Sequence, residues 1–173
     1  MDLSGLSRHT PASVVARREA AVLAPVIERD GAAHLLFTKR ADHLGEHPGQ
    51  MSFPGGGREP VDATLSDTAL REANEEIGLR ADEVDVISRL DDVTTSSKYA
   101  VRPFVGVAPD REYVPDESEV AEVVVLSVAD LSTPANYESE RRTDHPEYGD
   151  RRVHYFHVDG YTVWGVTGRM VVQ

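Results

Sequence analysis

Apolar and polar positions divide the chain into short segments, and most of these segments are typical of β-strands. Residues 18–40 contain two apolar-rich segments on either side of Asp30 and Gly31, a pair that favours a tight hairpin turn. A loop rich in glycine, proline and histidine follows at 41–50, and a short strand at 51–53 then leads into a run of glycines. We therefore expect the first third of the chain to be mainly β-structure.

The clearest helical pattern lies at residues 66–77, after the glycine run. Ser66 or Asp67 can cap the start of this helix, and Gly78 stands where helices commonly end. One side of the helix is apolar, with Leu70, Ala73 and Ile77 within about 60° of one another. The pattern predicts a helix that buries a narrow stripe of its surface.

The rest of the chain again alternates between apolar segments and turns. We expect strands at 85–93, 99–107 and 118–126, a short helix that ends before Pro134, a hairpin at 152–165 that turns at Asp159 and Gly160, and the start of a helix in the last residues. Many strands with two or three helices predict an α/β (α+β) fold, in which helices pack on the faces of a mixed β-sheet. The sequence has no repeat or low-complexity linker, so we expect residues 1–173 to form a single domain.

Composition limits the classes of protein that this chain can be. The 173 residues are 40% hydrophobic and include no cysteine, which excludes disulfides, thiolate metal sites and a cysteine nucleophile. The longest apolar run, residues 20–27, is far shorter than the roughly 20 residues of a membrane-spanning helix. The N-terminal residues do not resemble a secretory or transit peptide. We therefore expect a cytoplasmic protein that does not bind membranes.

The charge balance is strongly acidic. Thirty acidic residues face 18 basic ones, and the formal net charge is −12. Such a surface repels nucleic-acid backbones, so we expect no nucleic-acid partner. Two explanations stay open: a codon bias of the host, or a halophilic adaptation in which high salt screens the repulsion between like charges. In either case a phosphorylated substrate would need cations to bridge the repulsion.

Glu72, Glu75 and Glu76 form an acidic face on the expected helix, because positions i, i+3 and i+4 are neighbours there. Arg71 lies four residues before Glu75 and can hold that carboxylate, but one arginine cannot neutralise three glutamates. A solvated acidic face is the simplest interpretation. Clustered carboxylates beside a glycine-rich loop also suit a hard cation, Mg²⁺ or Mn²⁺, which binds oxygen ligands and substrate phosphate. Both interpretations stay open on helix spacing alone.

The sequence around this helix resembles the Nudix box, whose pattern is G-x5-E-x7-R-E-U-x-E-E-x-G-U, with U an apolar residue. Gly56 begins the match, and residues 71–79, REANEEIGL, fit the second half completely. Asp62 replaces the first glutamate of the box, with one extra residue between it and Arg71, and a strict count back from Arg71 reaches Ala63. This acidic group is shorter or displaced, so it is a weak candidate for a metal ligand.

Residues 36–56 resemble the motif LLTxR[SA]x3Rx3Gx3FPGG, which precedes the box in the coenzyme A pyrophosphatases of the Nudix family. The matching positions are Leu36, Thr38, Arg40, Ala41, Gly49, Phe53, Pro54, Gly55 and Gly56. Phe37 replaces a leucine, and Gly45 stands where the motif has an arginine, which would remove a cationic contact to the substrate. Residues 163–170, VWGVTGRM, also resemble the W-G-x-T-x-R segment of these enzymes.

The resemblance implies a Nudix-type α/β/α sandwich with a mixed β-sheet and gives roles to particular residues. It assigns metal ligation to Glu72, Glu75 and Glu76, together with the backbone carbonyl of Gly55. A cation there would neutralise a diphosphate and lower the pKa of a bound water for attack on phosphorus. The catalytic set includes Glu72 and Arg71, and the candidate substrate-binding residues are Arg40, Phe53 and Gly56. Arg40 can pair with phosphate through its guanidinium, or it can form a surface ion pair.

The general base is not fixed by this resemblance. Glu117 and Glu119 precede an expected strand, in a loop where some Nudix enzymes carry a base and a further metal ligand. We assign Glu117 as the candidate base and Glu119 as the candidate ligand, with solvated loop carboxylates as the alternative for both. Glu72 is the other candidate base.

Two further residue pairs attract attention, but neither predicts a site. His43 and His47 are four residues apart, yet the glycines and proline around them disfavour a helix and no third ligand follows, so we do not expect zinc. Trp164 and Tyr155 are expected in the core or on a sheet face and not as platforms for adenine.

Together these features predict Mg²⁺- or Mn²⁺-dependent hydrolysis of a diphosphate linkage in a small nucleotide metabolite. The leading substrate is coenzyme A or an acyl derivative, and the resemblance implies 3′,5′-ADP and 4′-phosphopantetheine as products. Two alternatives stay open: the same chemistry on ADP-ribose, NADH or an oxidised dNTP, and a non-catalytic domain that only binds a nucleotide. The oligomeric state also stays open, with a homodimer among the options.

Overall fold

The structure is a computed structural model that describes residues 5, 9–45, 47–95, 98–145 and 149–173. In chain order its elements are β1 (Arg18–Arg29), β2 (Ala32–Arg40), β3 (Met51–Ser52), β4 (Gly55–Gly57), α1 (Leu65–Ile77), η2 (Ala81–Glu83), β5 (Asp85–Arg89), β6 (Val93–Thr94), β7 (Tyr99–Ala108), β8 (Val120–Ser127), α2 (Val128–Leu131), η3 (Pro134–Asn136), β9 (Tyr137–His145), β10 (Gly149–Val158), β11 (Tyr161–Trp164) and α3 (Gly165–Val171). Within these ranges no helix is long and apolar enough to cross a membrane.

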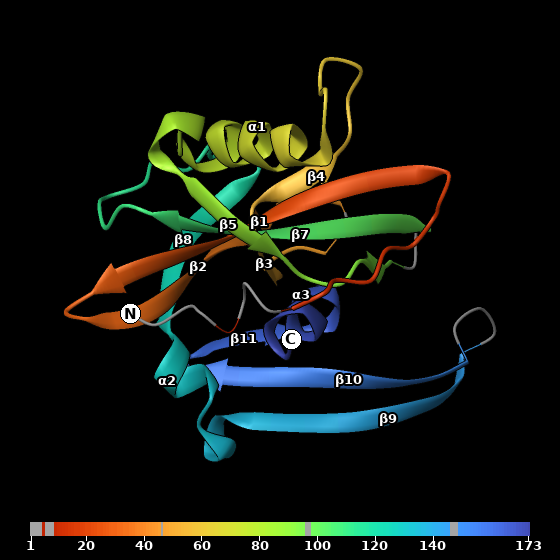
Figure 1. The fold of residues 1–173 in the computed structure, drawn as a ribbon. Coiled ribbons are helices and arrows are strands. Elements are labelled where there is room, and N and C mark those ends of the chain that lie inside the picture. Colours follow the sequence, from red (N-terminus) through yellow and green to blue (C-terminus); the bar gives the residue numbers. More distant parts are fainter. Residues whose placement is uncertain (1–4, 6–8, 46, 96–97, 146–148) are drawn as a thin grey trace.

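The described strands form two sheets, and the larger one is mixed (Figure 1). Its main order is β3-β2-β1-β7-β5, while β4, β6 and β8 pair with β1, β7 and β2, respectively. β1 runs parallel to β7 but antiparallel to β2 and β4. β1 is thus central to the sheet, and it carries the short glycine strand β4 beside it.

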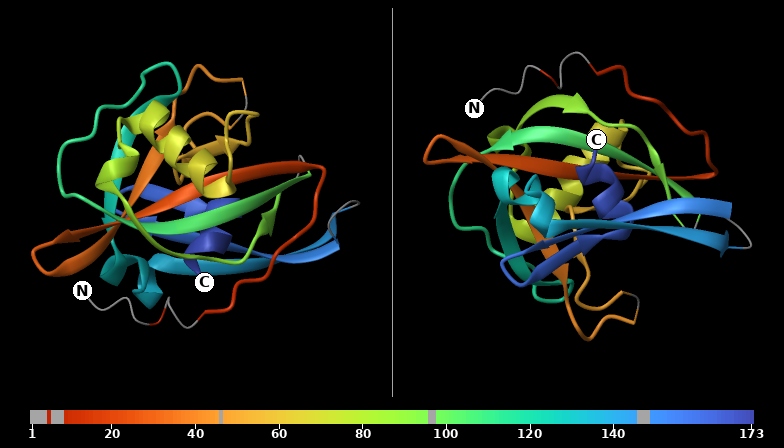
Figure 2. Two further views of the ribbon diagram at one scale, coloured as in Figure 1. Left: turned by 45° about the horizontal axis from the view of Figure 1, so that its top comes forward. Right: turned by 90° about the horizontal axis from the view of Figure 1, so that it is seen from below.

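Each face of the large sheet is covered by a different layer (Figures 1 and 2). Ala21, Leu23 and Ile27 of β1 pack toward α1, in one apolar cluster. The alternate residues of β1 pack in a second cluster with Phe156 and Val163, which belong to the small sheet β11-β10-β9. Burial on both faces explains why β1 is almost continuously apolar. The predicted α/β arrangement with a mixed sheet is confirmed.

The helix α1 begins one residue earlier than predicted, and its cap differs. Thr64 is the N-cap: its hydroxyl accepts a hydrogen bond from the Asp67 backbone N–H at 3.2 Å, and the Asp67 carboxylate accepts one from the Thr64 N–H at 2.8 Å. This reciprocal pair is a capping box. Neither Ser66 nor Asp67 is the cap, whereas Gly78 ends the helix as predicted, with φ 65°.

The buried side of α1 is also shifted from the predicted stripe. Ala73 and Ile77 are buried as predicted, but Leu70 is only partly buried. The other buried positions of the helix are Leu65, Thr68 and Ala69. Because Ala69 and Ala73 are small, the helix lies close over β1, and its glutamates lie beside the glycine strand.

Both predicted hairpins are present. The turn between β1 and β2 holds Asp30 and Gly31 at φ 53° and 75°, and the turn between β10 and β11 holds Asp159 and Gly160 at φ 52° and 82°. By contrast, the sequence does not predict β9, which pairs with β10 at the edge of the small sheet and has no second partner among the described strands. Its described side chains are mostly exposed, so no apolar alternation marks it in the sequence.

Candidate active site

Arg71 joins α1 to the loop and strand that precede it. Its Nε and Nη2 donate to the two carboxylate oxygens of Asp62, each at 3.0 Å. Its Nη1 donates to both Glu72 and Glu75 at 2.9 Å, and Nη2 also donates to the Gly57 carbonyl oxygen at 3.0 Å. These contacts use all five N–H groups of the guanidinium. The predicted contact with Glu75 is therefore present, and Arg71 holds other groups in place.

Asp62 anchors this network from a buried position. Its side chain is 3% exposed, and Oδ2 also accepts hydrogen bonds from the Glu59 backbone N–H at 2.8 Å and the Thr68 hydroxyl at 2.9 Å. The Arg71 guanidinium above all holds the pKa of the Asp62 carboxyl well below its usual range. Ala63, the residue reached by the strict count, is exposed. Asp62 therefore occupies the acidic position of the motif, and it faces an arginine.

The two glycines after Pro54 are required by close packing. A Cβ on Gly55 would lie 2.4 Å from the Ala21 backbone oxygen, and a Cβ on Gly56 would lie 2.5 Å from Oε1 of Glu72. At Gly55 the obstruction is backbone, so a side chain has no room there, whereas at Gly56 a side chain would displace the Glu72 carboxylate. The glycine strand thus lies between β1 and the Glu72 carboxylate, which brings its backbone next to the acidic face of α1.

Glu76 and Glu72 are carboxylates with raised pKa values. Oε1 of Glu76 accepts a hydrogen bond from the Gly55 N–H at 3.3 Å. Burial raises the pKa of Glu76 to about 8, and the charges of Glu72 and Glu119 add to the rise. Burial also raises the pKa of Glu72, although its hydrogen bond with Arg71 opposes the rise. Crowded carboxylates of this kind are typical of functional sites.

The loop before β8 is fastened to the end of α1. The Asp116 backbone N–H donates to the Glu76 carbonyl oxygen at 2.8 Å, and the Glu119 N–H donates to the Asp116 carbonyl oxygen at 2.9 Å. The charge of Glu119 raises the pKa of both Glu72 and Glu76, so Glu119 lies near these two carboxylates. Glu117 lies on the same loop with an exposed side chain.

Two of the candidate substrate-binding residues occupy different environments. Arg40, at the end of β2, is half-buried, and its charge lowers the pKa of Glu76, which places it near the acidic face. Phe53 is 3% exposed and stacks on Phe37 with ring centroids 4.8 Å apart. The Phe53 side chain therefore belongs to the core and can affect the site only through the glycine turn beside it.

The histidine and aromatic pairs have structural partners. His43 Nε2 is 3.1 Å from the Ser118 carbonyl oxygen, and His47 is an exposed turn residue at φ 52°, so the two do not share a helix. Tyr155 and Trp164 stack across the β10–β11 pair, with centroids 5.9 Å apart. They are sheet-face residues, as predicted.

The donor set around the acidic face suits a divalent cation by its chemistry. It consists of carboxylates, the hard oxygen ligands that Mg²⁺ and Mn²⁺ prefer, with the backbone of Gly55 beside them. In the part of the chain that the structure describes, no three carboxylate or imidazole groups converge as a finished metal site. Instead Glu72 and Glu75 face Arg71, and Glu76 faces the Gly55 N–H. A cation would have to compete with these partners for the carboxylate oxygens.

Comparison with known sequences gives one consistent family. Residues 17–147 match the NUDIX domain family. The uncharacterized Nudix hydrolase NudL of Enterobacter sp. (strain 638) is 37% identical over 163 residues, which cover 91% of this chain and 81% of the relative. The protein of the same description from Yersinia pestis (strain Pestoides F) is 37% identical over 155 residues, covering 89% and 76%.

Solved structures share the fold at lower identity. The Nudix hydrolase RenU of M. smegmatis aligns with a TM-score of 0.54 and 23% identity, over 68% of this chain and 75% of that one. The NUDIX domain of Shewanella oneidensis NrtR, solved with ADP ribose, aligns with a TM-score of 0.54 and 16% identity, over 75% and 86%. The sequence matches and the shared fold thus indicate the same family, and the matched region includes Arg71, the three glutamates of α1 and the glycine turn. The chain belongs to the Nudix hydrolase family.

Proposed function

We propose that the protein hydrolyses the diphosphate linkage of coenzyme A or an acyl-coenzyme A, giving 3′,5′-ADP and 4′-phosphopantetheine. The observation that carries this proposal is the motif at residues 36–56, which resembles the segment before the box in coenzyme A pyrophosphatases. Two of its residues lie beside the acidic face: Arg40 lies near Glu76, and Gly56 lies directly against Glu72. A motif that frames the carboxylates in this way is well placed to orient a diphosphate.

Nudix hydrolases generally use divalent metal cations, and we propose Mg²⁺ or Mn²⁺ for this one. The groups that would hold the cation are the carboxylates of Glu72, Glu75, Glu76 and Glu119 and the Gly55 carbonyl oxygen. When bound, the cation would neutralise the diphosphate and make a water acidic enough to attack phosphorus. The excess of acid on this protein makes such a counter-charge necessary for an anionic substrate.

The remaining residues would position the substrate and move a proton. Arg71 keeps Glu72 and Glu75 together through its Nη1, so that both carboxylates stay on the side of α1 that faces the glycine turn. Arg40 would bind phosphate oxygens next to Glu76. Glu117 and Glu72 both remain candidates for the general base, because each is a carboxylate on an element that borders the site. We further propose a cytoplasmic location, in line with the absence of cysteine.

A substrate comparison on one preparation tests this proposal. The protein is incubated with Mg²⁺ and with coenzyme A, dephospho-coenzyme A, ADP-ribose or NADH, and kcat/KM is measured for each while mass spectrometry identifies the products. We expect coenzyme A to have the highest value and to yield 3′,5′-ADP. A tenfold or greater preference for ADP-ribose or NADH would contradict the coenzyme A assignment. Absence of turnover with every diphosphate would instead favour a domain that only binds nucleotides.

A further inference from the structure

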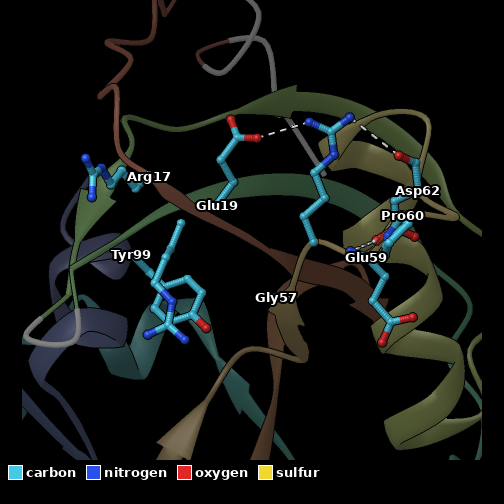
Figure 3. A pocket seen from close by; sticks show the side chains of 9 residues that line it. Arg17, Glu19, Gly57, Glu59, Pro60, Asp62 and Tyr99 are labelled. Carbon is cyan, nitrogen blue, oxygen red and sulfur yellow. Dashed lines mark hydrogen bonds and ion pairs between the residues drawn. The ribbon is translucent and has the colours of Figure 1, made fainter.

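A hollow of about 510 Å³ opens beside the glycine strand, outside the group of carboxylates (Figure 3). Its walls come from the start of β1, the end of β4, the loop after β4 and the first residue of β7. Arg17 and Tyr99 lie at one end, and Glu59 and Asp62 lie at the other (Figure 3). The parallel pairing of β1 with β7 brings these distant parts of the sequence together, because Arg18 pairs with Tyr99.

This hollow adjoins the candidate active site. Gly57 and Asp62 line it, and both accept hydrogen bonds from Arg71, the residue that holds Glu72. Strand residues are spaced about 3.3 Å apart, so Gly57 lies roughly 7 Å along β4 from Gly55. A substrate whose diphosphate lies at Gly55 can therefore place a neighbouring group in the hollow.

Two cations in the hollow, Arg17 and Arg18, form no ion pair with an acidic side chain of the described residues. Arg17 is exposed and makes no side-chain hydrogen bond or ion pair within the described ranges. The Arg18 guanidinium lies 4.6 Å from the centre of the Tyr99 ring. Arg58, in contrast, is held by the Glu19 carboxylate at 3.0 Å and by backbone carbonyl oxygens. Arg17 and Arg18 thus offer positive charge that is rare on a chain of net charge −12.

The chemistry of this end of the hollow matches a phosphorylated nucleoside. Guanidinium groups bind phosphate oxygens with paired N–H donors, and an arginine stacked on an aromatic ring presents a flat surface to a ribose or base. Coenzyme A carries a phosphomonoester on the ribose next to its diphosphate, and Gly45 stands where the related motif has an arginine. A cation from another part of the chain would then have to meet that phosphate.

We propose that Arg17 and Arg18, beside Tyr99, bind the 3′-phosphate on the nucleoside half of the substrate. This subsite rests on the proposed function, because it is the hydrolysis of coenzyme A that puts such a phosphate next to the site. It makes the hollow a specificity site for 3′-phosphorylated nucleotides, separate from the carboxylates that carry out the reaction.

Nucleotide binding to the whole protein in Mg²⁺ tests this subsite. Calorimetry measures the affinities for 3′,5′-ADP and 5′-AMP of the wild type, Arg17→Gln and Arg18→Gln. The control is Arg29→Gln, because Arg29 lies at the far end of β1 and pairs with Asp110. We expect the wild type to prefer 3′,5′-ADP by about ten- to a hundredfold, the range of one or two charge-assisted contacts. Each hollow variant should lose most of this preference while its affinity for 5′-AMP stays unchanged, and Arg29→Gln should keep the preference.

Two outcomes overturn the subsite. One is a wild type that binds both nucleotides equally, and the other is a loss of affinity in Arg17→Gln and Arg18→Gln that is the same for both nucleotides. Since Arg17 is exposed and makes no side-chain hydrogen bond or ion pair in the described part of the chain, Arg17→Gln keeps the test valid even if Arg18→Gln loosens β1.

The failure of the subsite can be told apart from the failure of the proposed function. If coenzyme A is hydrolysed with the same KM by Arg17→Gln and the wild type, the subsite is wrong and the function stands. If coenzyme A is not hydrolysed, yet 3′,5′-ADP is preferred in a manner that depends on Arg17, the proposed substrate is wrong and the subsite stands.

Discussion

Asp62 and Glu76 are two partly or fully buried carboxylates at opposite ends of the same network of loop and helix, and their surroundings shift their pKa values in opposite directions. Asp62 accepts hydrogen bonds from Arg71, Thr68 and the Glu59 backbone, and its pKa lies well below the usual range. Glu76 accepts one side-chain hydrogen bond within the described structure, from the Gly55 N–H, and burial raises its pKa to about 8.

This difference indicates that Asp62 has a structural role, whereas Glu76 remains available to bind a cation. Both carboxylate oxygens of Asp62 already accept hydrogen bonds from the protein, and the charge of Arg71 balances that of Asp62, so this residue stabilises its surroundings and is a poor candidate for a ligand. Glu76 is crowded by the like charges of Glu72 and Glu119. A cation would relieve that crowding, whereas at Asp62 it would meet an arginine.

Removing the charge of Glu76 gives the largest expected effect on activity. Glu76→Gln keeps the shape of the side chain but removes the charge of a proposed metal ligand, so we expect kcat at saturating Mg²⁺ to fall by about three orders of magnitude or more. Glu75→Gln should act in the same direction. Steady-state kinetics measure the change, and circular dichroism checks the fold. The control is Glu112→Gln, the same change at an exposed position. If Glu76→Gln and Glu112→Gln have equal rates, Glu76 is not part of the active site.

Removing the charge of Asp62 should instead act mainly on stability. Asp62→Asn leaves Arg71 without the partner that binds its Nε and Nη2, and loss of one member of a buried ion pair costs about 3 kcal/mol. Urea unfolding measures the free energy of unfolding. Asp110→Asn is the matched control, because its pair with Arg29 is exposed and screened by solvent, so its loss should change the free energy of unfolding far less. Equal losses in the two variants would refute the anchoring role of Asp62.

The raised pKa of Glu76 should also make the stability of the metal-free protein depend on pH. Glu76 keeps its proton in the folded state up to a pKa of about 8 but releases it in the unfolded state near 4.5, so stability should fall as pH rises from 5 to 8.5. The loss should be on the order of a few kcal/mol. Thermal unfolding in EDTA across this range measures it. Glu76→Gln should flatten the decline, and an unchanged slope in that variant would show that another group titrates.

Features that depend on nearby residues follow from the sequence, and features that depend on distant partners do not. The Asp-Gly turns, α1 and the glutamates of its acidic face are encoded within short segments, so their patterns predict them. The predicted cap is wrong because Thr64, Ser66 and Asp67 are all good cap residues, and the Asp67 that completes the capping box stands where Glu or Gln is usual. The edge strand β9 buries little of its surface and leaves no apolar pattern.

The roles of the acidic residues show the same limit. The motif places Asp62 near the start of the box, but that its carboxylate faces Arg71 follows from the path of the loop between β4 and α1. Similarly, Arg18 and Tyr99 are far apart in sequence and meet only because β1 and β7 pair in parallel. Spacing identifies which groups can react, and tertiary contacts decide which are free to do so.

Proton release on metal binding tests most directly whether Glu76 is the carboxylate kept available for a cation. A group with a pKa of about 8 is mostly protonated at pH 7, and a cation that takes it as a ligand must displace the proton. Titration of Mg²⁺ into the protein by calorimetry, in buffers of different ionisation enthalpy, counts the protons released. We predict close to one proton per cation for the wild type and for Asp62→Asn, and almost none for Glu76→Gln. Cation binding to the wild type without proton release, or with the same release in Glu76→Gln, would contradict the assignment.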